Sequence, residues 1–301
     1  MSAPRTVVSG GSGYVGRFIV ERLLAEGHRV TVTGRTNPAD GFFSAPVEFV
    51  AGHLEVDEDH AATFAATDFF VHCAFDHLPG KFRGGEGDDP GGFRRRNLDA
   101  TLARFRQAKM GGVKRAVFLS SRAVYGDWTE GAELTEETKP CPNSLYGEVK
   151  LAGEEGLAEL ADASFRGISL RVTGVYGPPP PGREHKWAGV VADHMAGRSV
   201  ISRIGTEVHG EDVAWAVMIA LTAKIASPHE IFCVSDIVVD NADMMAIVND
   251  AAGLSHPVPD RVDPGRHQAM NSAKLRSLGW SPGGWPLFET SVRELAEALR
   301  A

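Results

Sequence analysis

The sequence predicts a doubly wound α/β fold, with a parallel β-sheet covered by helices on both faces and a small mixed α/β lobe at the carboxyl end. Three observations predict it. Short apolar or β-branched runs alternate with stretches of helical periodicity through the first half of the chain. The first of these runs ends in a cluster of glycines, and a proline run at residues 178–181 marks a change to shorter, mixed segments. Such alternation is typical of a parallel sheet that is buried on both faces.

The first predicted unit is a strand, a tight turn and a helix. Residues 5–9 are β-branched and end in glycines, and apolar residues then recur at helical spacing up to Gly27. A second strand is predicted for residues 29–33, directly after that helix. Further strands are predicted at 47–50, 69–73, 116–120 and 168–172, with helices at 98–108 and 146–160 between them.

The carboxyl-terminal part reads as a second unit. Beyond residue 177 we predict a strand at 231–234 and a final helix ending at Ala301. We therefore divide the chain into residues 1–177 and 178–301, and expect the second part to be interleaved, with one segment returning to the main sheet. The glycine-rich stretch 84–92 predicts a loop, which is either a lid beside a site or an inert surface insertion.

Composition limits the class of protein. Apolar residues make up 43% of the 301 residues and charged residues 23%, as in folded globular proteins. The net charge of −8 repels phosphate backbones and anionic lipid, so neither nucleic acid nor a membrane is an expected partner. The three cysteines are an odd number without CxxC spacing, which suggests neither a disulfide framework nor a cysteine-based zinc site, and the amino terminus lacks the apolar core of a secretion signal. These features predict a cytoplasmic protein.

Gly10, Gly13 and Gly16 follow the first strand and open the first helix. At this position the backbone approaches a dinucleotide's pyrophosphate, and a Cβ atom would block that approach. The spacing alone is weak evidence, but its place after a first strand predicts a dinucleotide-binding turn. Packing alone is the alternative reason for such a turn.

The end of the second strand indicates which dinucleotide binds. A carboxylate there usually receives the ribose hydroxyls of NAD, whereas an arginine accommodates the additional phosphate of NADP. Residues 31–37 contain no acid but include Arg35 and Thr36. NADP is therefore predicted over NAD, with an ordinary exposed turn residue as the other interpretation of Arg35.

Tyr146 and Lys150 are four residues apart in a helical pattern, so both side chains lie on one helix face. An ammonium group beside a phenol favours the phenolate, which makes the tyrosine a usable acid or base. Ser120 and Ser121 follow a predicted strand whose carboxyl end faces the same crevice. Together these residues predict a proton-transfer site.

The combination of motifs resembles the extended short-chain dehydrogenases/reductases, a Rossmann-type fold, within the NAD(P)-dependent epimerase/dehydratase family. The matching segments are 10–16 (GGSGYVG), 71–74 (VHCA), Asn97, 119–126 (LSSRAVYG), the Tyr146/Lys150 pair, 170–178 (LRVTGVYGP) and 274–282 (KLRSLGWSP). They span nearly the whole chain, and their combination is far more specific than any one of them.

The resemblance implies that Tyr146 is the catalytic acid/base, that Lys150 binds the nicotinamide ribose and lowers the tyrosine pKa, and that Ser121 hydrogen-bonds the reacting oxygen. It implies a proton-relay or structural role for Asn97, and a homodimer is usual for the family. Ser121 is preferred to Ser120 because it stands four residues before Tyr125. The expected cofactor contacts are Gly10, Gly13, Tyr14, Val15, Gly16, Arg35, Thr36, Leu54, Cys73, Ala74, Phe75, Tyr146, Lys150, Thr173 and Val175.

Two departures from the family's pattern bear on the substrate. Nucleotide-sugar epimerases and dehydratases commonly carry an asparagine that holds the substrate diphosphate, where this chain has Gly174. The region 202–213 also lacks their Gly-Asp-Gly stretch, and Arg203 is displaced. Both departures argue against a nucleotide sugar as the substrate.

The sequence thus predicts an NADP-dependent oxidoreductase that transfers a hydride between nicotinamide and a carbonyl or alcohol carbon of a small or sugar-like molecule. A nucleotide-sugar epimerase or dehydratase with tightly bound NAD(P) is one alternative, and a non-catalytic NAD(P)-binding sensor is another. No metal is expected, because the eleven histidines form no HExxH or zinc-finger spacing.

Overall fold

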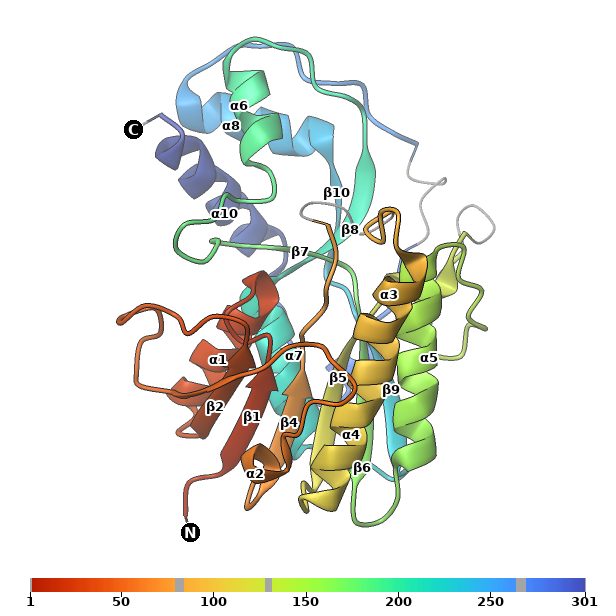
Figure 1. Cartoon of the computed structure of the whole chain (residues 1–301). Coiled ribbons are helices and arrows are strands. Elements are labelled where there is room, and N and C mark those ends of the chain that lie inside the picture. Colours follow the sequence, from red (N-terminus) through yellow and green to blue (C-terminus); the bar gives the residue numbers. More distant parts are fainter. Residues whose placement is uncertain (1, 79–83, 128–131, 264–268, 301) are drawn as a thin grey trace.

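The computed structural model describes residues 2–78, 84–127, 132–263 and 269–300. Its body is built on a seven-stranded sheet in the order β3-β2-β1-β4-β5-β6-β9, in which all neighbouring strands are parallel. A smaller lobe lies above the carboxyl ends of these strands (Figure 1). The strands are β1 (Arg5–Ser9), β2 (Arg29–Gly34), β3 (Glu48–Ala51), β4 (Phe69–His72), β5 (Arg115–Ser121), β6 (Arg166–Val172) and β9 (His229–Val234).

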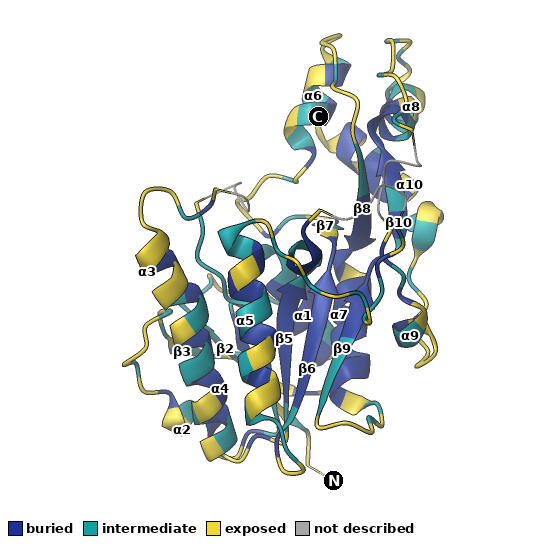
Figure 2. Ribbon diagram, turned by 90° about the vertical axis from the view of Figure 1, so that its right-hand side faces the viewer, coloured by how far each residue is buried: buried dark blue, intermediate teal, exposed yellow. Residues whose placement is uncertain are grey.

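Successive strand residues point to opposite faces of the sheet, and each face is covered by helices. Val8 and Val117 pack in one cluster with α1 (Tyr14–Ala25) and α7 (Gly210–Thr222). Their neighbours Val7 and Ala116 pack in another cluster with α4 (Ala100–Met110) and α5 (Leu145–Leu160). Figure 2 shows β5 and β6 buried while the outer faces of α4 and α5 are exposed. The sheet is therefore buried on both faces.

Four short helices complete the body and its border with the lobe. They are α2 (Ala61–Phe64), α3 (Pro90–Arg94), the 3₁₀ turn after β5 (Arg122–Tyr125) and α9 (Ala273–Arg276). Helix α3 continues through one π-helical turn (Arg95–Asp99) into α4.

The lobe contains a second sheet in the order β10-β8-β7, with β7 (Gly174–Tyr176), β8 (Ile204–His209) and β10 (Ile237–Asp240). Its helices are α6 (Ala188–Met195), α8 (Asn241–Ala252) and α10 (Gly284–Ala298). A separate apolar core, with Tyr176, Trp187 and Phe288 among its members, holds them together. The lobe thus has a hydrophobic centre of its own.

The predicted doubly wound α/β fold is confirmed, and the predicted strands occur with boundaries within two residues. Two details were wrong. The glycine-rich stretch 84–92 is not a loop throughout, because α3 begins at Pro90, where proline suits a first helical turn and the Asp89 carboxylate accepts the Gly92 N–H at 2.8 Å. The last helix ends at Ala298 rather than Ala301.

Within the described ranges, no helix is long and apolar enough to cross a membrane. The same residues include no group of three or more His, Cys, Asp or Glu side chains arranged to hold a metal ion.

Candidate functional site

The glycine turn brings two strand ends and the start of α1 into close contact. Gly10 has φ +72°, and a Cβ on it would lie 2.8 Å from the backbone of Ala74. A Cβ on Gly16 would lie 2.1 Å from the Gly10 carbonyl oxygen. Gly13 caps α1 without a side chain, and the first turn of that helix carries no acidic residue. The first turn of the helix therefore brings no negative charge of its own to the positive end of the helix dipole, which fits the pyrophosphate of a dinucleotide.

Tyr14 and Val15 begin α1. The Tyr14 hydroxyl donates a 2.6 Å hydrogen bond to the carbonyl of Gly177, just past β7. Burial raises the pKa of Tyr14 above its ordinary value, so the phenol keeps its proton. This bond ties the glycine turn to the lobe.

At the end of β2 the predicted phosphate-reading residues lie at the surface. The Arg35 side chain is 75% exposed, and its guanidinium lies 3.8 Å from the carboxylate of Asp76, which follows β4. Thr36 is also exposed.

Leu54 lies in a segment after β3 that is held by one arginine. The buried Arg104 guanidinium donates to the carbonyls of His53 at 3.0 Å and Glu58 at 2.7 Å, and pairs with the Glu58 carboxylate at 2.6 Å. Arg104 thereby fixes the backbone on both sides of Leu54.

Phe75, after β4, contacts both predicted catalytic side chains of α5. Its ring centre lies 5.1 Å from that of Tyr146, edge to face, and the Lys150 ammonium lies 4.4 Å from the Phe75 ring centre. Cys73 and Ala74 precede it, and burial raises the pKa of the Cys73 thiol, so that group stays neutral.

Tyr146 and Ser121 are brought together by a close approach of α5. A Cβ on Gly147 would lie 2.5 Å from the Ala123 carbonyl, so only glycine lets the first turn of α5 pack on the 3₁₀ turn after β5. Ser121 ends β5 and hydrogen-bonds the Tyr146 phenol. Burial raises the pKa of Tyr146, and the bond to Ser121 acts in the opposite direction.

Lys150 is buried beneath them. Its ammonium donates to the Leu119 carbonyl at 2.6 Å and also lies 4.9 Å from the ring centre of Phe118. Burial lowers the pKa of Lys150 to about 7, an effect that the carboxylate of Glu154 partly offsets. The group is therefore poised between its two protonation states near neutral pH.

A buried ion pair lies behind this site. Arg171 of β6 binds Glu154 of α5 through Nε at 3.1 Å and Nη2 at 2.7 Å, and each side chain is only 2% exposed. Ser120 donates to the same carboxylate, and the guanidinium lies 4.8 Å from the Tyr125 ring centre. Glu154 is one helical turn beyond Lys150, so the pair fixes α5 against the strand ends that carry Ser120 and Ser121.

Asn97 lies in the π-helical turn and is saturated by backbone groups. Its Oδ1 accepts the Asp76 N–H at 2.6 Å, while Nδ2 donates to the carbonyls of Asp76 at 2.7 Å and Phe93 at 3.0 Å. It therefore clamps the segment that follows β4. This arrangement favours the structural role over the proton relay for Asn97.

His72 connects that turn to the glycine turn. Its Nδ1 lies 2.6 Å from the Ser9 hydroxyl, and its Nε2 lies 2.8 Å from the Thr101 hydroxyl, which donates to the Asn97 carbonyl. Burial lowers the pKa of His72 to about 3, so the ring remains neutral.

The segment after β6 carries Thr173 and Val175, and between them Gly174 faces a carboxylate. A Cβ on Gly174 would lie 2.4 Å from Oε2 of Glu207, a buried residue of β8 that pairs with Lys186. The Thr173 hydroxyl donates to the Val234 carbonyl at 3.3 Å. Glu207 thus lies in the space that a side chain at residue 174 would need.

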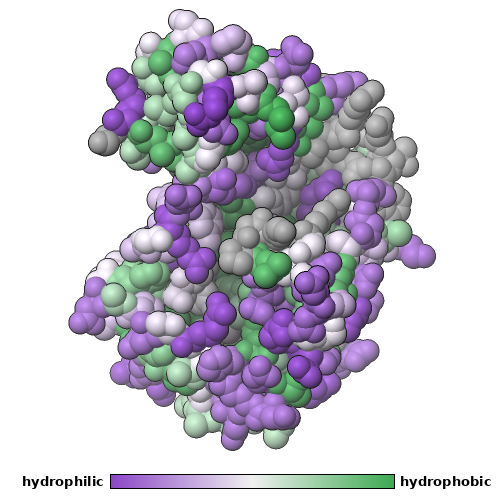
Figure 3. All heavy atoms as spheres, turned by 45° about the horizontal axis from the view of Figure 1, so that its top comes forward, coloured by the Kyte–Doolittle hydropathy of each residue, from purple (hydrophilic) through white to green (hydrophobic). Residues whose placement is uncertain are grey.

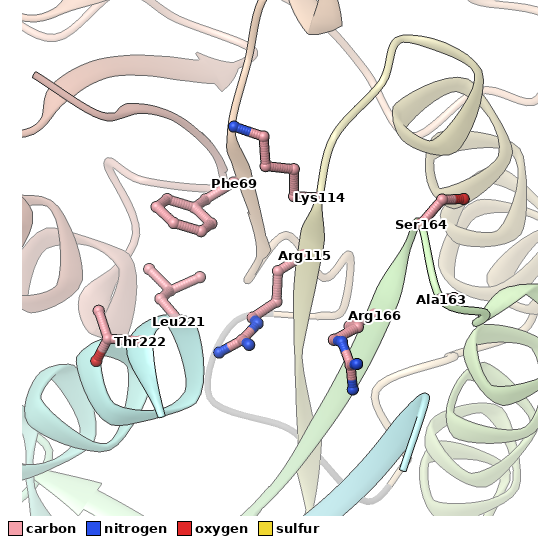
Figure 4. A pocket seen from close by; sticks show the side chains of 8 residues that line it. All are labelled: Phe69, Lys114, Arg115, Ala163, Ser164, Arg166, Leu221 and Thr222. Atoms are coloured by element: carbon pink, nitrogen blue, oxygen red, sulfur yellow. The ribbon is translucent and has the colours of Figure 1, made fainter. Parts of the chain in front are cut away.

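All these groups lie at one edge of the body, below the lobe, where the space-filling view shows a hollow between the two (Figure 3). A surface cavity of about 520 Å³ lies instead at the opposite end of the sheet, around Phe69, Arg115 and Leu221 (Figure 4). There Arg115 donates to the carbonyls of Ala220 and Ala223 at the end of α7, so it caps a helix.

Sequence reasoning missed several residues that build the site. They are Asp76, Arg104, Glu154, Arg171 and Glu207. Glu154 carried a usable signal, because it follows Lys150 by one helical turn on the same face. The other four meet their partners only through the sheet topology.

Three comparisons with known proteins are informative. The model of the NAD dependent epimerase/dehydratase family matches residues 6–234. A UDP-glucose 4-epimerase of Corynebacterium glutamicum is 26% identical over 92% of this chain and 91% of the relative. A dTDP-6-deoxy-L-talose 4-dehydrogenase (NAD(P)(+)) of Kitasatospora kifunensis is 28% identical over 98% of this chain and 97% of the relative.

Among solved structures, the Thermus thermophilus UDP-glucose 4-epimerase in complex with NAD superimposes with a TM-score of 0.78. It is 25% identical and covers 99% of each chain.

Proposed function

The chain belongs to the NAD-dependent epimerase/dehydratase family, and we propose that it is an oxidoreductase that interconverts a carbonyl and an alcohol on a small or sugar-like molecule. The observation that carries the proposal is the contact between Tyr146 and Ser121 above Lys150, at the sheet edge that also holds the glycine turn. A non-catalytic sensor would not require these three side chains together.

The residues divide the chemistry as follows. A bound nicotinamide would accept or supply the hydride. Tyr146 exchanges a proton with the substrate oxygen, and Ser121 holds that oxygen by a hydrogen bond. The Lys150 ammonium, 5.9 Å from the Tyr146 ring centre, stabilises the phenolate when it is charged. Burial raises the pKa of Tyr146, so this cationic help is needed for the tyrosine to act as a base.

Replacing the phenol tests this assignment. Tyr146→Phe should keep the affinity for the dinucleotide and lose at least about 100-fold in kcat, the usual contribution of a general acid or base. The measurements are nicotinamide fluorescence for binding and nicotinamide absorbance for turnover. An undiminished rate would remove Tyr146 from the mechanism.

For the cofactor we propose NADP rather than NAD. The support is the exposed Arg35 guanidinium at the end of β2 and the lack of an acid within residues 31–37. Arg35→Ala should weaken binding of NADPH much more than that of NADH. Equal losses for the two would contradict the preference.

Epimerisation of a nucleotide sugar is the second candidate, because a UDP-glucose 4-epimerase is among the relatives. Gly174 favours the reductase instead, because it offers no side-chain donor to a substrate diphosphate, and the space beside it is taken by Glu207, which pairs with Lys186. A reductase consumes NADPH in step with product. Net conversion of a sugar without any change in nicotinamide absorbance would support the epimerase.

We assign cofactor binding and proton transfer to residues 1–177, and substrate binding to residues 178–301. A homodimer and a cytoplasmic location stay predictions, which size-exclusion chromatography and cell fractionation would test.

A further inference from the structure

An ion pair crosses the glycine turn. Arg35 directly follows β2 and Asp76 follows β4, and in the sheet β1 lies between these two strands (Figure 1). A contact of 3.8 Å between the two side chains therefore spans the carboxyl end of β1, where Gly10 begins the turn. The pair therefore connects the segments after β2 and β4, between which a dinucleotide would lie.

The two partners differ in how firmly they are held. The backbone N–H and carbonyl of Asp76 are both bound by Asn97, and its carboxylate Oδ2 accepts from Arg96 Nε at 2.7 Å. Arg96 is in turn bound to Asp89 at 3.2 Å. The Arg35 side chain is 75% exposed, against 34% for Asp76. Arg35 is therefore the less constrained partner of the two.

We propose that Asp76 is a specificity-determining residue of the cofactor site, which competes with the 2′-phosphate of NADP for Arg35. The inference rests on the proposed role of Arg35 as the group that reads this phosphate. A phosphate monoester carries about −1.5 to −2 charges at pH 7 and can displace a single carboxylate from a guanidinium. The fixed Asp76 charge nevertheless repels that phosphate. The preference for NADP over NAD is therefore weaker than it would be with Arg35 alone.

The other charges around Asp76 do not cancel this effect. Arg96 holds one carboxylate oxygen but is shared with Asp89. His77 also faces the Asp76 charge, and burial lowers the pKa of that imidazole, so it adds little positive charge near neutral pH. Of the two Asp76 carboxylate oxygens, Arg96 binds Oδ2, and Oδ1 is the one that lies 3.8 Å from Arg35.

The test is Asp76→Asn in the full-length protein, with NADPH and NADH titrated separately by nicotinamide fluorescence. Removing the charge should tighten NADPH binding roughly three- to tenfold, because unit charges within several Å at a protein surface interact by about 1 kcal/mol. NADH should change by less than about twofold, since it lacks the phosphate. Asparagine is isosteric, and Asn97 binds only the backbone of residue 76, so the variant should fold; its melting temperature verifies this.

Asp40→Asn is the matched control. Asp40 is an exposed acid in the segment after β2, and the substitution changes the net charge by the same amount. It should leave the ratio of the two dissociation constants unchanged. If Asp76→Asn also leaves this ratio unchanged, or tightens NADPH and NADH equally, the inference is overturned.

Arg35→Ala separates this inference from the cofactor proposal. If Arg35→Ala weakens NADPH selectively while Asp76→Asn changes nothing, Asp76 has no role in selectivity and the proposed NADP preference stands. If Arg35→Ala affects both dinucleotides equally, both proposals fail. In the Arg35→Ala background, the gain from Asp76→Asn should be smaller than in the natural sequence, because the competition for the guanidinium is gone.

Discussion

The buried ion pair between Glu154 and Arg171 should be among the most sensitive points of the fold. Glu154→Ala leaves the Arg171 guanidinium, 2% exposed, without its carboxylate, and also removes the acceptor of Ser120. Breaking such a pair on one side costs about 3–5 kcal/mol of unfolding free energy. At about 2–4 °C per kcal/mol for a chain of this size, the melting temperature should fall by roughly 6–20 °C.

The assay is urea unfolding followed by circular dichroism, together with a thermal melt. Glu289→Ala is the control, because Glu289 is half-exposed and pairs with Arg293 one turn away on α10, where loss of the pair costs under about 1 kcal/mol. The double variant Glu154→Leu/Arg171→Met removes both charges and should recover most of the loss. A cost below about 1 kcal/mol for Glu154→Ala would refute the assignment of a buried, mutually dependent pair.

Three further predictions concern the site. Gly16→Ala should weaken dinucleotide binding more than tenfold, because its Cβ would lie 2.1 Å from the Gly10 carbonyl; Gly189→Ala, with no atom within 4 Å, is the control and should bind normally. Asn97→Ala should lower the unfolding free energy by about 2–4 kcal/mol, because three hydrogen bonds are lost, and it should also weaken dinucleotide binding. A loss of stability with unchanged binding would show that the contacts of Asn97 with Asp76 do not shape the cofactor site. Lys150 should make stability rise with pH between about 7 and about 10, because the folded protein releases this proton near pH 7 and the unfolded chain near 10.4. Lys150→Met should flatten that part of the profile in urea unfolding at several pH values, and an unaltered slope would contradict the low pKa.

The parts of the fold that depend on neighbours in sequence could be predicted. The segments of β1, β4 and β6 are short and rich in apolar or β-branched residues, so their local pattern was sufficient to predict them. The glycine stretch before α4 was harder, because a proline and an aspartate cap convert part of it into a helix. The lobe was predicted least well from the sequence, because β7 has only three residues and forms only by pairing with β8, which lies far along the chain.

The site divides in the same way. Tyr146 and Lys150 were found because helical spacing places them on one face. Asp76 was missed because its partner Arg35 follows a different strand, and only the order of β2, β1 and β4 brings them together. Glu207 was missed because its significance depends on the absence of a side chain at Gly174, which lies opposite it in a neighbouring strand.

The position of β9 has a consequence for how the chain folds as it is synthesised. This strand completes the main sheet beside β6, yet it is made only after α6, β8 and α7. Until the ribosome has released residue 234, β6 presents an open edge of unpaired backbone N–H and C=O groups, and such an edge can pair with other chains. A nascent chain stalled after β6 should therefore recruit chaperones, and release of β9 should end that dependence.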